Sequence, residues 1–428
     1  ASPERRTVPD LFRLVKAADL QKLQWLHVYD DVPGALLQSG SVEGIDMLEG
    51  FSGFIKTLAR EHLNVNIRMV NSFDPIDPAS FPVTAMGELG VAEKFVEFVY
   101  ENFERKRYLP VLCDIDESAP LSFELDEDSN VLVLGGAQGI TKELIAKLAA
   151  ECPCRYILVG RSQENEEEAR RYWDLNSIDE IRSRLISEGE LKNPREIEKR
   201  ASAIHKTAQI AKAKKQLGED IGAKVCYYAA DVSDEDEFVR LIDDVRAKYG
   251  KIDAVFHAVG VLEDKLFTVK TLESFERTYY TKVTPLRVIA RELLPDLKLL
   301  VMFGSVAATF GNQGQIDYAA GNTVFDLAAC LIKKNQEQTR VISFNWGPWS
   351  GTGMVSPGLE AEFKNRGLSM IHVEEGSGFF MDDVMYGGDL PVVLALAGDS
   401  GDLDLFIENA LDMTTWRPTA VYMKGAII

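Results

Sequence analysis

A glycine-rich turn in the stretch VLVLGGAQGIT is the first feature of this sequence that could support chemistry. Gly135, Gly136 and Gly139 lie between an apolar run and a segment with helical periodicity. Such a turn lets the backbone approach a pyrophosphate, and the following helix N-terminus offers unpaired N–H groups with a partial positive charge. Glycines also serve ordinary tight turns, so the flanking strand and helix decide the interpretation. The turn predicts a dinucleotide-binding site.

The end of the second predicted strand indicates which dinucleotide is bound. A site for NAD usually carries an acid there, whereas the 2′-phosphate of NADP requires an arginine. Arg161 ends the run YILVGR, which favours NADPH, although an arginine at a strand end can simply be exposed. Asp231 ends the third strand and could accept a hydrogen bond from the adenine amino group or cap the next helix. Ser233 or Asp234 is the better candidate for that cap.

The elements that must position this turn begin at Asn130. Apolar runs alternate with helical segments such as ITKELIAKLAAE and EDEFVRLIDDVRAKYG, a rhythm typical of parallel sheets with helices on both faces. We therefore expect an α/β fold with a Rossmann-type doubly wound parallel sheet. Its first five strands are predicted at residues 131–136, 156–161, 224–231, 252–260 and 299–305.

A smaller α/β lobe precedes this sheet. A chain of 428 residues exceeds the usual size of one domain. Residues 11–112 alternate strand-like runs, LQWLHVYD and VNIRMVNSF, with two segments that we read as helices, DMLEGFSGFIKTLAREH and VAEKFVEFVYENF. This lobe has no glycine-rich phosphate loop. The acidic stretch at 114–130 breaks the rhythm and is the predicted seam between the lobes.

Residues 163–222 interrupt the second lobe with a segment far longer than an ordinary connection between strands. The segment is rich in Glu, Lys, Arg and Ala, which are strong helix formers. We expect an inserted helical hairpin with Pro194 at a helix start. Its charges are most simply a solvated face, and a docking or dimer surface is the alternative.

Composition limits the classes of partner and compartment. The chain has 47 Lys+Arg and 67 Asp+Glu, and the formal net charge of −20 argues against nucleic acid as a general partner. No apolar run approaches the roughly 18 residues that a membrane span needs. Five cysteines favour reduced thiols, and Cys152 with Cys154 lacks the second ligand pair of a zinc site. We expect a soluble, cytoplasmic protein without a metal and without a membrane partner.

The order of several motifs resembles the ketoreductase domains of polyketide synthases and polyunsaturated fatty acid synthases, members of the short-chain dehydrogenase/reductase superfamily. The motifs are VLVLGGAQGIT, ILVGRS, FHAVGVLED, TKVTPL, FGSVAATFGNQGQIDYAAGN and NWGPWSGTGM. The first lobe, with GFIKTLAREH and RYLPVL, is similar to the family's truncated Rossmann-like structural subdomain. The resemblance implies a structural subdomain at 1–127 and an NADPH-binding catalytic subdomain at 128–428, with the insertion at about 163–222.

The resemblance also implies where the catalytic lysine lies. In ordinary short-chain reductases a lysine follows the catalytic tyrosine by four residues, whereas YAAGN places Asn322 four residues after Tyr318. In the resembled ketoreductases the lysine and asparagine exchange places, and Lys282 in YYTKVTP stands at the upstream position. The two arrangements can bring the ammonium to the same space from different parts of the backbone.

Hydride transfer to a ketone gives the implied catalytic residues their roles, because charge develops on the carbonyl oxygen. Tyr318 is the expected acid. A phenol titrates near pH 10 and the ammonium of Lys282 is expected to lower that pKa. Ser305 would hydrogen-bond the carbonyl oxygen, and Asn322, on the same helical face as Tyr318, would hold the lysine or a water that relays protons.

Further residues are implied around the cofactor. NADPH is expected to contact two groups beyond the glycines and Arg161: residues that follow strands, and residues of the NWGPWSGTGM stretch. They are Gln138, Ile140, Ser162, Asp231, Val232, His257, Ala258, Val259, Gly260, Pro348 and Trp349. Pro348, Trp349 and Met354 would form the floor and the lid hinge over the nicotinamide and the acyl arm, whereas core packing explains Trp346 equally well.

Two motifs bear on the configuration of the product. VLED resembles the Leu-Asp-Asp signature of B-type ketoreductases, whose products carry the D-configured β-hydroxyl, with Asp264 at the diagnostic third position and Glu263 in place of the middle acid. A-type domains carry a tryptophan where Phe310 stands. We therefore expect a B-type domain. The residues assigned to substrate binding and stereocontrol are Leu262, Glu263, Asp264, Phe310, Gln315 and Met354.

The sequence also departs from the family pattern. Thr141 stands where the loop ordinarily has a further glycine, and Leu134 replaces a loop threonine. Both changes bear on cofactor affinity and not on the fold. The long insertion is closer to iterative polyunsaturated fatty acid synthases than to modular polyketide synthases. The abrupt ends, without a start methionine, suggest a piece of a much larger protein.

The function implied is reduction of a β-ketoacyl thioester by NADPH, giving the β-hydroxyacyl thioester. The expected partners are an acyl carrier protein, which holds the substrate on its phosphopantetheine arm, and other domains of the same synthase. One alternative is an extended nucleotide-sugar epimerase or dehydratase, and Asn322 speaks against it. The other is a catalytically silent structural module, although Tyr318, Ser305 and Lys282 all remain.

Overall fold

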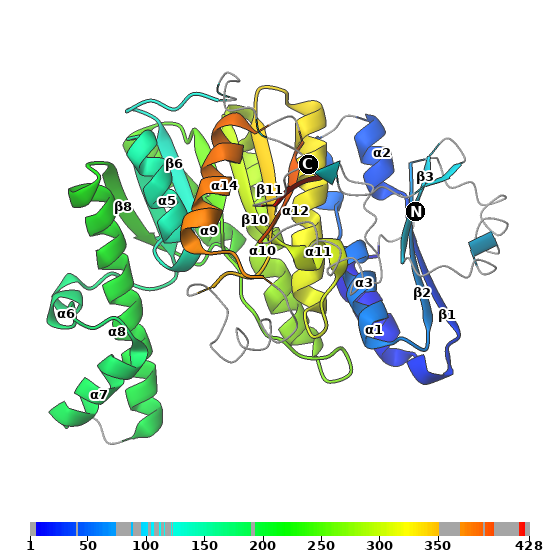
Figure 1. Ribbon diagram of the computed structural model, residues 1–428, viewed down its shortest axis with the longest axis horizontal. Coiled ribbons are helices and arrows are strands. Elements are labelled where there is room, and N and C mark those ends of the chain that lie inside the picture. Colours follow the sequence, from blue (N-terminus) through cyan, green and yellow to red (C-terminus); the bar gives the residue numbers. More distant parts are fainter. Residues whose placement is uncertain are drawn as a thin grey trace. The chain divides into compact units, whose positions relative to one another are not determined.

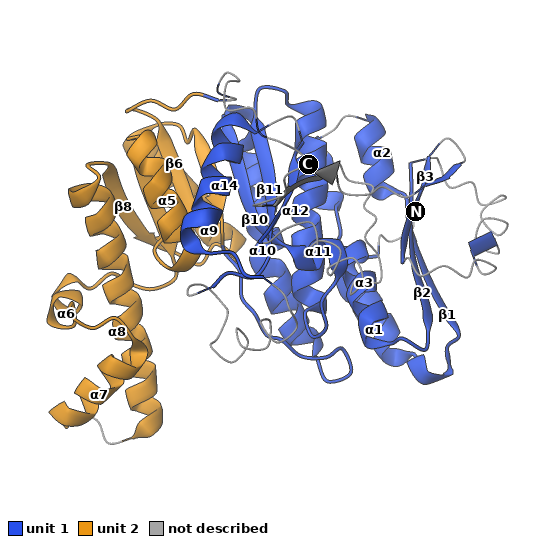
Figure 2. Cartoon of the chain, viewed as in Figure 1, with its two compact units in different colours: residues 1–123, 259–428 blue, residues 124–258 orange. Residues whose placement is uncertain are grey.

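The computed structural model describes most of the chain, and it divides into two compact units, residues 124–258 and residues 1–123 with 259–428 (Figure 2). The described residues are 6–39, 42–73, 87–88, 96–101, 104–106, 111–112, 115, 121, 123–189, 193–350, 369–387, 390–397 and 419–423. Among the helices in these ranges, none combines the length and the apolar character that crossing a bilayer requires.

The unit of residues 124–258 is built on four parallel strands in the order β8-β7-β6-β9. In chain order these are the third, second, first and fourth strands, the arrangement of one half of a Rossmann-type doubly wound sheet. Its elements are β6 (Asn130–Leu134), α5 (Gly139–Glu151), β7 (Arg155–Gly160), α6 (Glu166–Arg171), α7 (Ile178–Glu188), α8 (Pro194–Lys215), a π-helix (Gln216–Asp220), β8 (Lys224–Ala229), α9 (Glu235–Tyr249) and β9 (Ala254–His257) (Figure 1).

The order of these strands determines where a ligand can bind in this unit. The chain runs from β6 outward to β7 and β8 and then returns to the other side of β6, where it forms β9. The carboxyl ends of β6 and β9 therefore flank the point at which the strand order reverses, where α/β sheets bind ligands. Side chains of residues 130–134 are buried, as the predicted apolar run requires.

The inserted segment is helical, with a small apolar core of its own. Helices α6 and α7 both pack against α8. Pro194 occupies the first turn of α8, where its missing N–H leaves no hydrogen bond unmade, and Asn193 caps that helix. The side chains that form the core are Tyr172, Ile181, Leu185, Ile197, Ala201 and Ile204. The described part of the segment therefore forms three packed α-helices and not a simple hairpin.

The other unit contains two groups of strands. One is a sheet in the order β1-β2-β3-β4, with β3 and β4 antiparallel; the other is the parallel order β5-β13-β12-β11-β10. The strands are β1 (Trp25–Asp30), β2 (Asn66–Ser72), β3 (Glu97–Glu101), β4 (Glu104–Lys106), β5 (Val111–Leu112), β10 (Leu299–Ser305), β11 (Arg340–Trp346), β12 (Val392–Leu396) and β13 (Thr419–Met423). The helices are α1 (Val8–Ala17), α2 (Val32–Ser39), α3 (Phe51–Glu61), α10 (Leu272–Glu292), α11 (Val306–Phe310), α12 (Ile316–Asn335) and α14 (Val373–Tyr386).

One predicted helix is wrong. The stretch VAEKFVEFVYENF was read as helical, but within its described part residues Glu97–Glu101 form strand β3, which pairs with β2. Glu97 carries a charge and yet lies in the core. Its carboxylate is ion-paired with Lys56 and accepts hydrogen bonds from Ser52 and Asn71. Because a buried charge is tolerated when it is paired, the tertiary contact overrides the local pattern.

Helix α3 of the N-terminal lobe lies directly against α12. A Cβ atom on Gly50 would come within 2.0 Å of the carbonyl oxygen of Ala320, and one on Gly53 within 2.3 Å of that of Ala319. Two glycines therefore permit a backbone approach that no other residue allows. Figure 1 shows α3 beside α11 and α12. The N-terminal lobe thus supports the helix that carries Tyr318.

Candidate active site

Lys282 and Tyr318 converge although they belong to different helices. The Lys282 Nζ lies 5.4 Å from the centre of the Tyr318 ring and 4.6 Å from that of Phe325, and its side chain is buried. The same nitrogen donates a hydrogen bond to the carbonyl oxygen of Phe303 at 2.9 Å. Helices α10 and α12 therefore bring the displaced lysine beside the tyrosine.

Gly260 leaves the space that this pair occupies. A Cβ atom at this position would lie 3.3 Å from Cε and 3.5 Å from Nζ of Lys282, and 4.0 Å from the ring of Tyr318. The first of these distances is tighter than ordinary van der Waals contact, so a side chain would press on the lysine. Gly260 thus borders the pair directly.

Burial dominates the proton equilibria of both groups. It lowers the pKa of Lys282 from its ordinary value of 10.5 to about 7. It raises the pKa of Tyr318, an effect increased by the charge of Asp264 and opposed by polar interactions with Asn322 and Ser305. The expectation that the lysine lowers the pKa of Tyr318 is therefore wrong for this structure, because removing the phenolate from water outweighs the stabilising contacts.

Ser305 is held at the end of β10 by a buried polar network. Its Oγ accepts a hydrogen bond from the Ala307 N–H at 3.2 Å, and its own N–H donates to Oδ1 of Asn345 at 3.0 Å. The Asn345 amide in turn donates to both carboxylate oxygens of Asp326 at 3.0 Å. Asn345 and Asp326 are fully buried and were missed from the sequence, since nothing in their spacing relates them to Ser305.

Asn322 is fully buried on α12, one turn beyond Tyr318. Its Nδ2 donates to the backbone carbonyl oxygen of Tyr318 at 2.8 Å. Its Oδ1 is buried and has no hydrogen-bond partner among the described residues. A buried acceptor without a donor is costly, and it is suited to a water molecule or an ammonium group.

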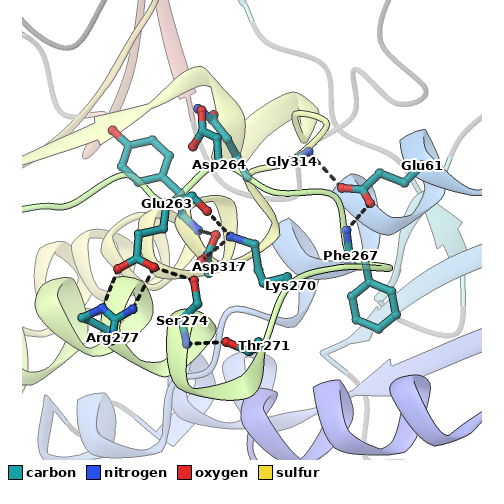
Figure 3. Close-up of polar contacts among 12 residues, drawn as sticks. Glu61, Glu263, Asp264, Phe267, Lys270, Thr271, Ser274, Arg277, Gly314 and Asp317 are labelled. Carbon is teal, nitrogen blue, oxygen red and sulfur yellow. Dashed lines mark hydrogen bonds and ion pairs between the residues drawn. The ribbon is translucent and has the colours of Figure 1, made fainter.

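Glu263 is bound to helix α10. Its carboxylate accepts hydrogen bonds from the Arg277 guanidinium, at 2.8 Å for Nη2, and from the Ser274 hydroxyl at 2.7 Å (Figure 3). The hydrogen bonds from Arg277 and then Ser274 lower the pKa of Glu263 to about 2. The structure therefore gives this residue an anchoring role for its loop, which does not require contact with substrate.

Asp264 and Gln315 form a pair that links two loops. The Gln315 amide donates to Oδ2 of Asp264 at 2.9 Å, and the neighbouring Lys265 N–H donates to the carbonyl oxygen of Gly314, also at 2.9 Å. Asp264 is exposed, yet its charge acts on the pKa of Tyr318. Two residues assigned to stereocontrol are thus joined to each other close to the tyrosine.

Phe310, Leu262 and Met354 are the other residues assigned to substrate binding and stereocontrol. Phe310 is buried, and its carbonyl oxygen accepts a hydrogen bond from Arg60 Nε at 2.6 Å. Leu262 is half-buried. Met354 lies outside the described residues. Of this group, the structure therefore places Phe310 in the core beside the N-terminal lobe.

The tryptophans at and just after the end of β11, Trp346 and Trp349, pack into the core. Trp346 stacks on Phe344 with ring centres 4.9 Å apart, which is the core packing that we held as its alternative explanation. Trp349 is buried against Trp346, and a Cβ atom on Gly376 of α14 would lie 2.2 Å from its ring. Its indole therefore supports α14, whereas Pro348 beside it is half-exposed.

In the unit of residues 124–258, the glycine-rich turn between β6 and α5 contains two glycines in the left-handed region of φ. Gly135 and Gly139 have φ values of +85° and +60°, which favour glycine. The Gly135 N–H donates to the carbonyl oxygen of Val159 at 2.8 Å, and this fixes the start of the turn. Gln138, at the N-cap of α5, makes no side-chain capping hydrogen bond. The N-terminal N–H groups of α5 are therefore not taken up by an N-cap side chain.

Tyr227 supports the turn that carries Arg161, and the sequence did not reveal it. Its hydroxyl donates to the carbonyl oxygen of Ser162 at 2.7 Å, and a Cβ atom on Gly160 would lie 2.9 Å from that hydroxyl. The Arg161 side chain is exposed, and no ion pair joins it to a described residue. A guanidinium without a protein partner can bind a phosphate.

The remaining residues assigned to the cofactor lie at or just after the ends of β8 and β9, apart from Ile140 in the first turn of α5. Asp231 accepts hydrogen bonds from Ser233, at 3.0 Å for the N–H and 2.6 Å for the hydroxyl. Asp234 caps α9 by accepting from the Glu237 N–H at 2.9 Å, which confirms one of the two predicted caps. The other members of this group are mostly buried or half-buried: Ile140, Val232, His257, Ala258 and Val259.

Residues 129–351, just over half of the chain, match a family described as the KR domain. Among curated relatives, a polyunsaturated fatty acid synthase polypeptide of Thraustochytrium is 27% identical over 76% of this chain and 12% of its own length. Polyketide synthase PksN of Bacillus subtilis is 24% identical over 73% of this chain and 5% of its own. The chain therefore spans a small fraction of the relatives that it matches.

Solved structures share the fold. A ketoreductase domain from the bacillaene assembly line has a TM-score of 0.62 at 20% identity, covering 90% of this chain and 80% of its own. An N-terminal ketoreductase from the macrolactin assembly line has a TM-score of 0.63 at 20% identity, covering 94% of this chain and 69% of its own. Both similarities support the Rossmann-type α/β fold.

Proposed function

The chain belongs to the KR (ketoreductase) domain family, and on that basis we propose that it reduces a β-ketoacyl thioester to the β-hydroxyacyl thioester with NADPH. The observation that carries the proposal is the approach of Lys282 to Tyr318, with Gly260 beside both. An ordinary surface lysine would be exposed to solvent. Lys282 is instead buried beside a tyrosine ring, and both residues belong to motifs that resemble those of the family. The pair instead has the residue types that proton delivery to a carbonyl oxygen requires.

NADPH fits the residues of the unit 124–258. The left-handed Gly135 and Gly139 and the N-terminus of α5 are suited to the pyrophosphate. Arg161 is exposed and would bind the 2′-phosphate, with its backbone held by the hydrogen bond from Tyr227 to Ser162. When bound, the dinucleotide supplies the hydride for the β-carbon. Asp231 would accept from the adenine amino group with the oxygen that Ser233 leaves free.

The residues of the other unit would control the proton and the carbonyl oxygen. Ser305 would donate a hydrogen bond to the substrate oxygen, since the Asn345–Asp326 network fixes its position. Tyr318 would deliver the proton, and its raised pKa keeps the hydroxyl protonated until negative charge develops beside it. When Lys282 is protonated, its positive charge would stabilise the phenolate that Tyr318 becomes after it gives up the proton. The Oδ1 of Asn322 would accept from Lys282 or from a water that returns the proton.

The substrate would be carried on the phosphopantetheine arm of an acyl carrier protein within a multidomain synthase. The short fraction of each relative that this chain spans supports such a setting. We propose residues 1–127 as the structural subdomain and 128–428 as the catalytic subdomain of a cytoplasmic enzyme. The Asp264–Gln315 pair supports a B-type domain that gives the D-configured hydroxyl, because the diagnostic acid is held close to Tyr318.

Product analysis with a β-ketoacyl thioester tests the proposal. Purified chain, NADPH and substrate are expected to give the β-hydroxyacyl thioester with predominantly D configuration. Binding of the cofactor without turnover across short and long thioesters would instead indicate a silent structural module. A product with the L configuration would retain the reductase and remove the B-type assignment.

A further inference from the structure

A buried lysine that the catalytic scheme does not use lies next to the candidate active site. Lys270 and Asp317 are both fully buried and form an ion pair, with Nζ 2.6 Å from Oδ2 (Figure 3). Asp317 immediately precedes Tyr318, and its Oδ1 accepts a hydrogen bond from the Tyr318 N–H at 2.9 Å. The pair therefore touches the backbone of the candidate acid.

The same lysine reaches a second loop. Its Nζ donates to the carbonyl oxygen of Glu263 at 2.8 Å. The next residue along the chain is Asp264, which is joined to Gln315. A single ammonium group thus connects the first turn of α12 with the loop that carries the diagnostic acid.

Other contacts also hold the loop of residues 261–270, but they act on other atoms than the Glu263 carbonyl oxygen. The Glu263 side chain is bound by Arg277 of α10, and the Phe267 N–H donates to Glu61 at 2.6 Å. Neither contact involves α12. Two further contacts join the loop to the segment that leads into α12, from Gln315 to Asp264 and from the Lys265 N–H to the Gly314 carbonyl oxygen, but they do not hold the backbone at Glu263. Within the described residues, the link from the backbone at Glu263 to the backbone at Tyr318 runs through Lys270 and its ion-pair partner Asp317.

Stability alone does not explain a buried ion pair at this place. Removing two charges from water is expensive, and replacing such a pair with apolar residues is often neutral or stabilising. An apolar pair would fill the volume but could not donate to the Glu263 carbonyl oxygen. What the ion pair adds is a fixed geometry between two segments.

We propose that Lys270 is a positioning residue that fixes Tyr318 relative to the Asp264–Gln315 pair and so determines which face of the ketone is presented to the cofactor. The inference rests on the proposed reductase function and deepens it. A shift of the loop relative to the tyrosine would change the orientation of the substrate while leaving the dinucleotide turn intact. The effect is therefore expected in the hydroxyl configuration and in the KM for thioester.

Two charge-neutral double variants test this role. Lys270→Met with Asp317→Asn removes the link to Glu263 but keeps an acceptor for the Tyr318 N–H. Lys270→Gln with Asp317→Asn keeps an N–H donor, but the amide is uncharged and one bond shorter than the lysine side chain. Lys265→Met, an exposed lysine of the same loop, is the matched control for losing a lysine. A short thioester not bound to a carrier protein is used throughout.

The methionine variant is expected to raise the proportion of the minor hydroxyl configuration by about tenfold or more, together with the KM for thioester. The glutamine variant should fall between it and the wild type, and it carries the test alone if the methionine variant does not fold. The KM for NADPH should change by less than about twofold in each, since no dinucleotide contact is altered. The control should match the wild type.

Three results would overturn the inference while the reductase function stands. The first is a wild type that gives both hydroxyl configurations equally. The second is an active double variant whose product configuration and KM for thioester equal those of the wild type. The third is a double variant in which only kcat falls and the product configuration is preserved. A wild type that reduces no β-ketoacyl thioester would instead remove the proposed function, before any variant is compared.

Discussion

The Nζ of Lys282 lies 5.4 Å from the centre of the Tyr318 ring, and the two residues reach this position from helices α10 and α12. The Lys282 side chain is buried at this position, and burial lowers its pKa from 10.5 to about 7. The charge beside the tyrosine therefore changes within the physiological pH range, and the fold carries the penalty of a buried amine.

Lys282→Met is expected to increase stability in a way that depends on pH. The pKa of Lys282 falls from 10.5 to about 7 on folding, so between these values the unfolded chain holds a proton that the folded chain lacks. The penalty is complete below about pH 7 and is lost as pH rises towards 10.5. The variant should therefore exceed the wild type most below neutrality, with a difference that narrows at alkaline pH.

Denaturant unfolding of the two proteins across this range measures the difference in free energy. Lys265→Met, at an exposed position, controls for the loss of a lysine and should change stability little. A difference that stays constant from acid to alkaline pH would contradict the buried-amine account of Lys282.

Arg161→Ala is expected to raise the KM for NADPH by about 10- to 100-fold and to leave the KM for NADH nearly unchanged, because a charge-assisted contact to the 2′-phosphate is lost. Initial rates with each dinucleotide give the comparison. Arg170→Ala, which removes an exposed guanidinium from α6, should affect neither constant. Equal effects of Arg161→Ala on the two dinucleotides would argue against the phosphate assignment.

Tyr227→Phe removes the hydrogen bond of 2.7 Å to the Ser162 carbonyl oxygen and should loosen the turn that holds Arg161. A KM for NADPH raised by about twofold to tenfold is expected, with kcat largely retained. Tyr228→Phe makes the same chemical change on the opposite face of the strand and is the matched control. If the two variants behave alike, Tyr227 has no special role in supporting the turn.

Glu61→Gln tests the support that the N-terminal lobe gives to the active-site loops. The carboxylate accepts hydrogen bonds from the N–H groups of Phe267 at 2.6 Å and Gly314 at 2.9 Å. The amide presents only one acceptor, so one N–H loses its partner and unfolding should become easier by about 1–3 kcal/mol. Glu273→Gln, at an exposed position of α10, should change the free energy of unfolding much less. If both variants lower the free energy of unfolding equally, the hydrogen bonds of Glu61 do not stabilise the active-site loops.

The parts of the fold that the sequence predicted correctly depend on local patterns. The apolar run LLVMFGS became β10 with the predicted bounds, Leu299–Ser305, since buried strands need continuous apolar residues. Strand β3 was missed because Glu97 is neutralised by Lys56, a residue distant in the chain. A local pattern cannot reveal which charges will be paired.

In the candidate site, too, the sequence predicted the residues that belong to motifs and missed the contacts that depend on the tertiary structure. Lys282 and Tyr318 were found through the family motifs, which encode their convergence. The contact of Lys270 with Asp317 spans 47 positions and belongs to no motif that was recognised. The direction of the Tyr318 pKa was wrong because it depends on burial by neighbouring segments, and spacing in the sequence does not report burial.

The most direct test of the central claim follows the hydride and the proton donor together. Purified chain is incubated with a β-ketoacyl thioester and NADPH that carries deuterium at both positions of C4 of the nicotinamide, and the product is analysed by mass spectrometry for wild type and Tyr318→Phe. The account predicts one deuterium on the β-carbon of the wild-type product and a rate about 10²- to 10⁴-fold lower for the variant. An unlabelled product, or an undiminished rate without the Tyr318 hydroxyl, would contradict it.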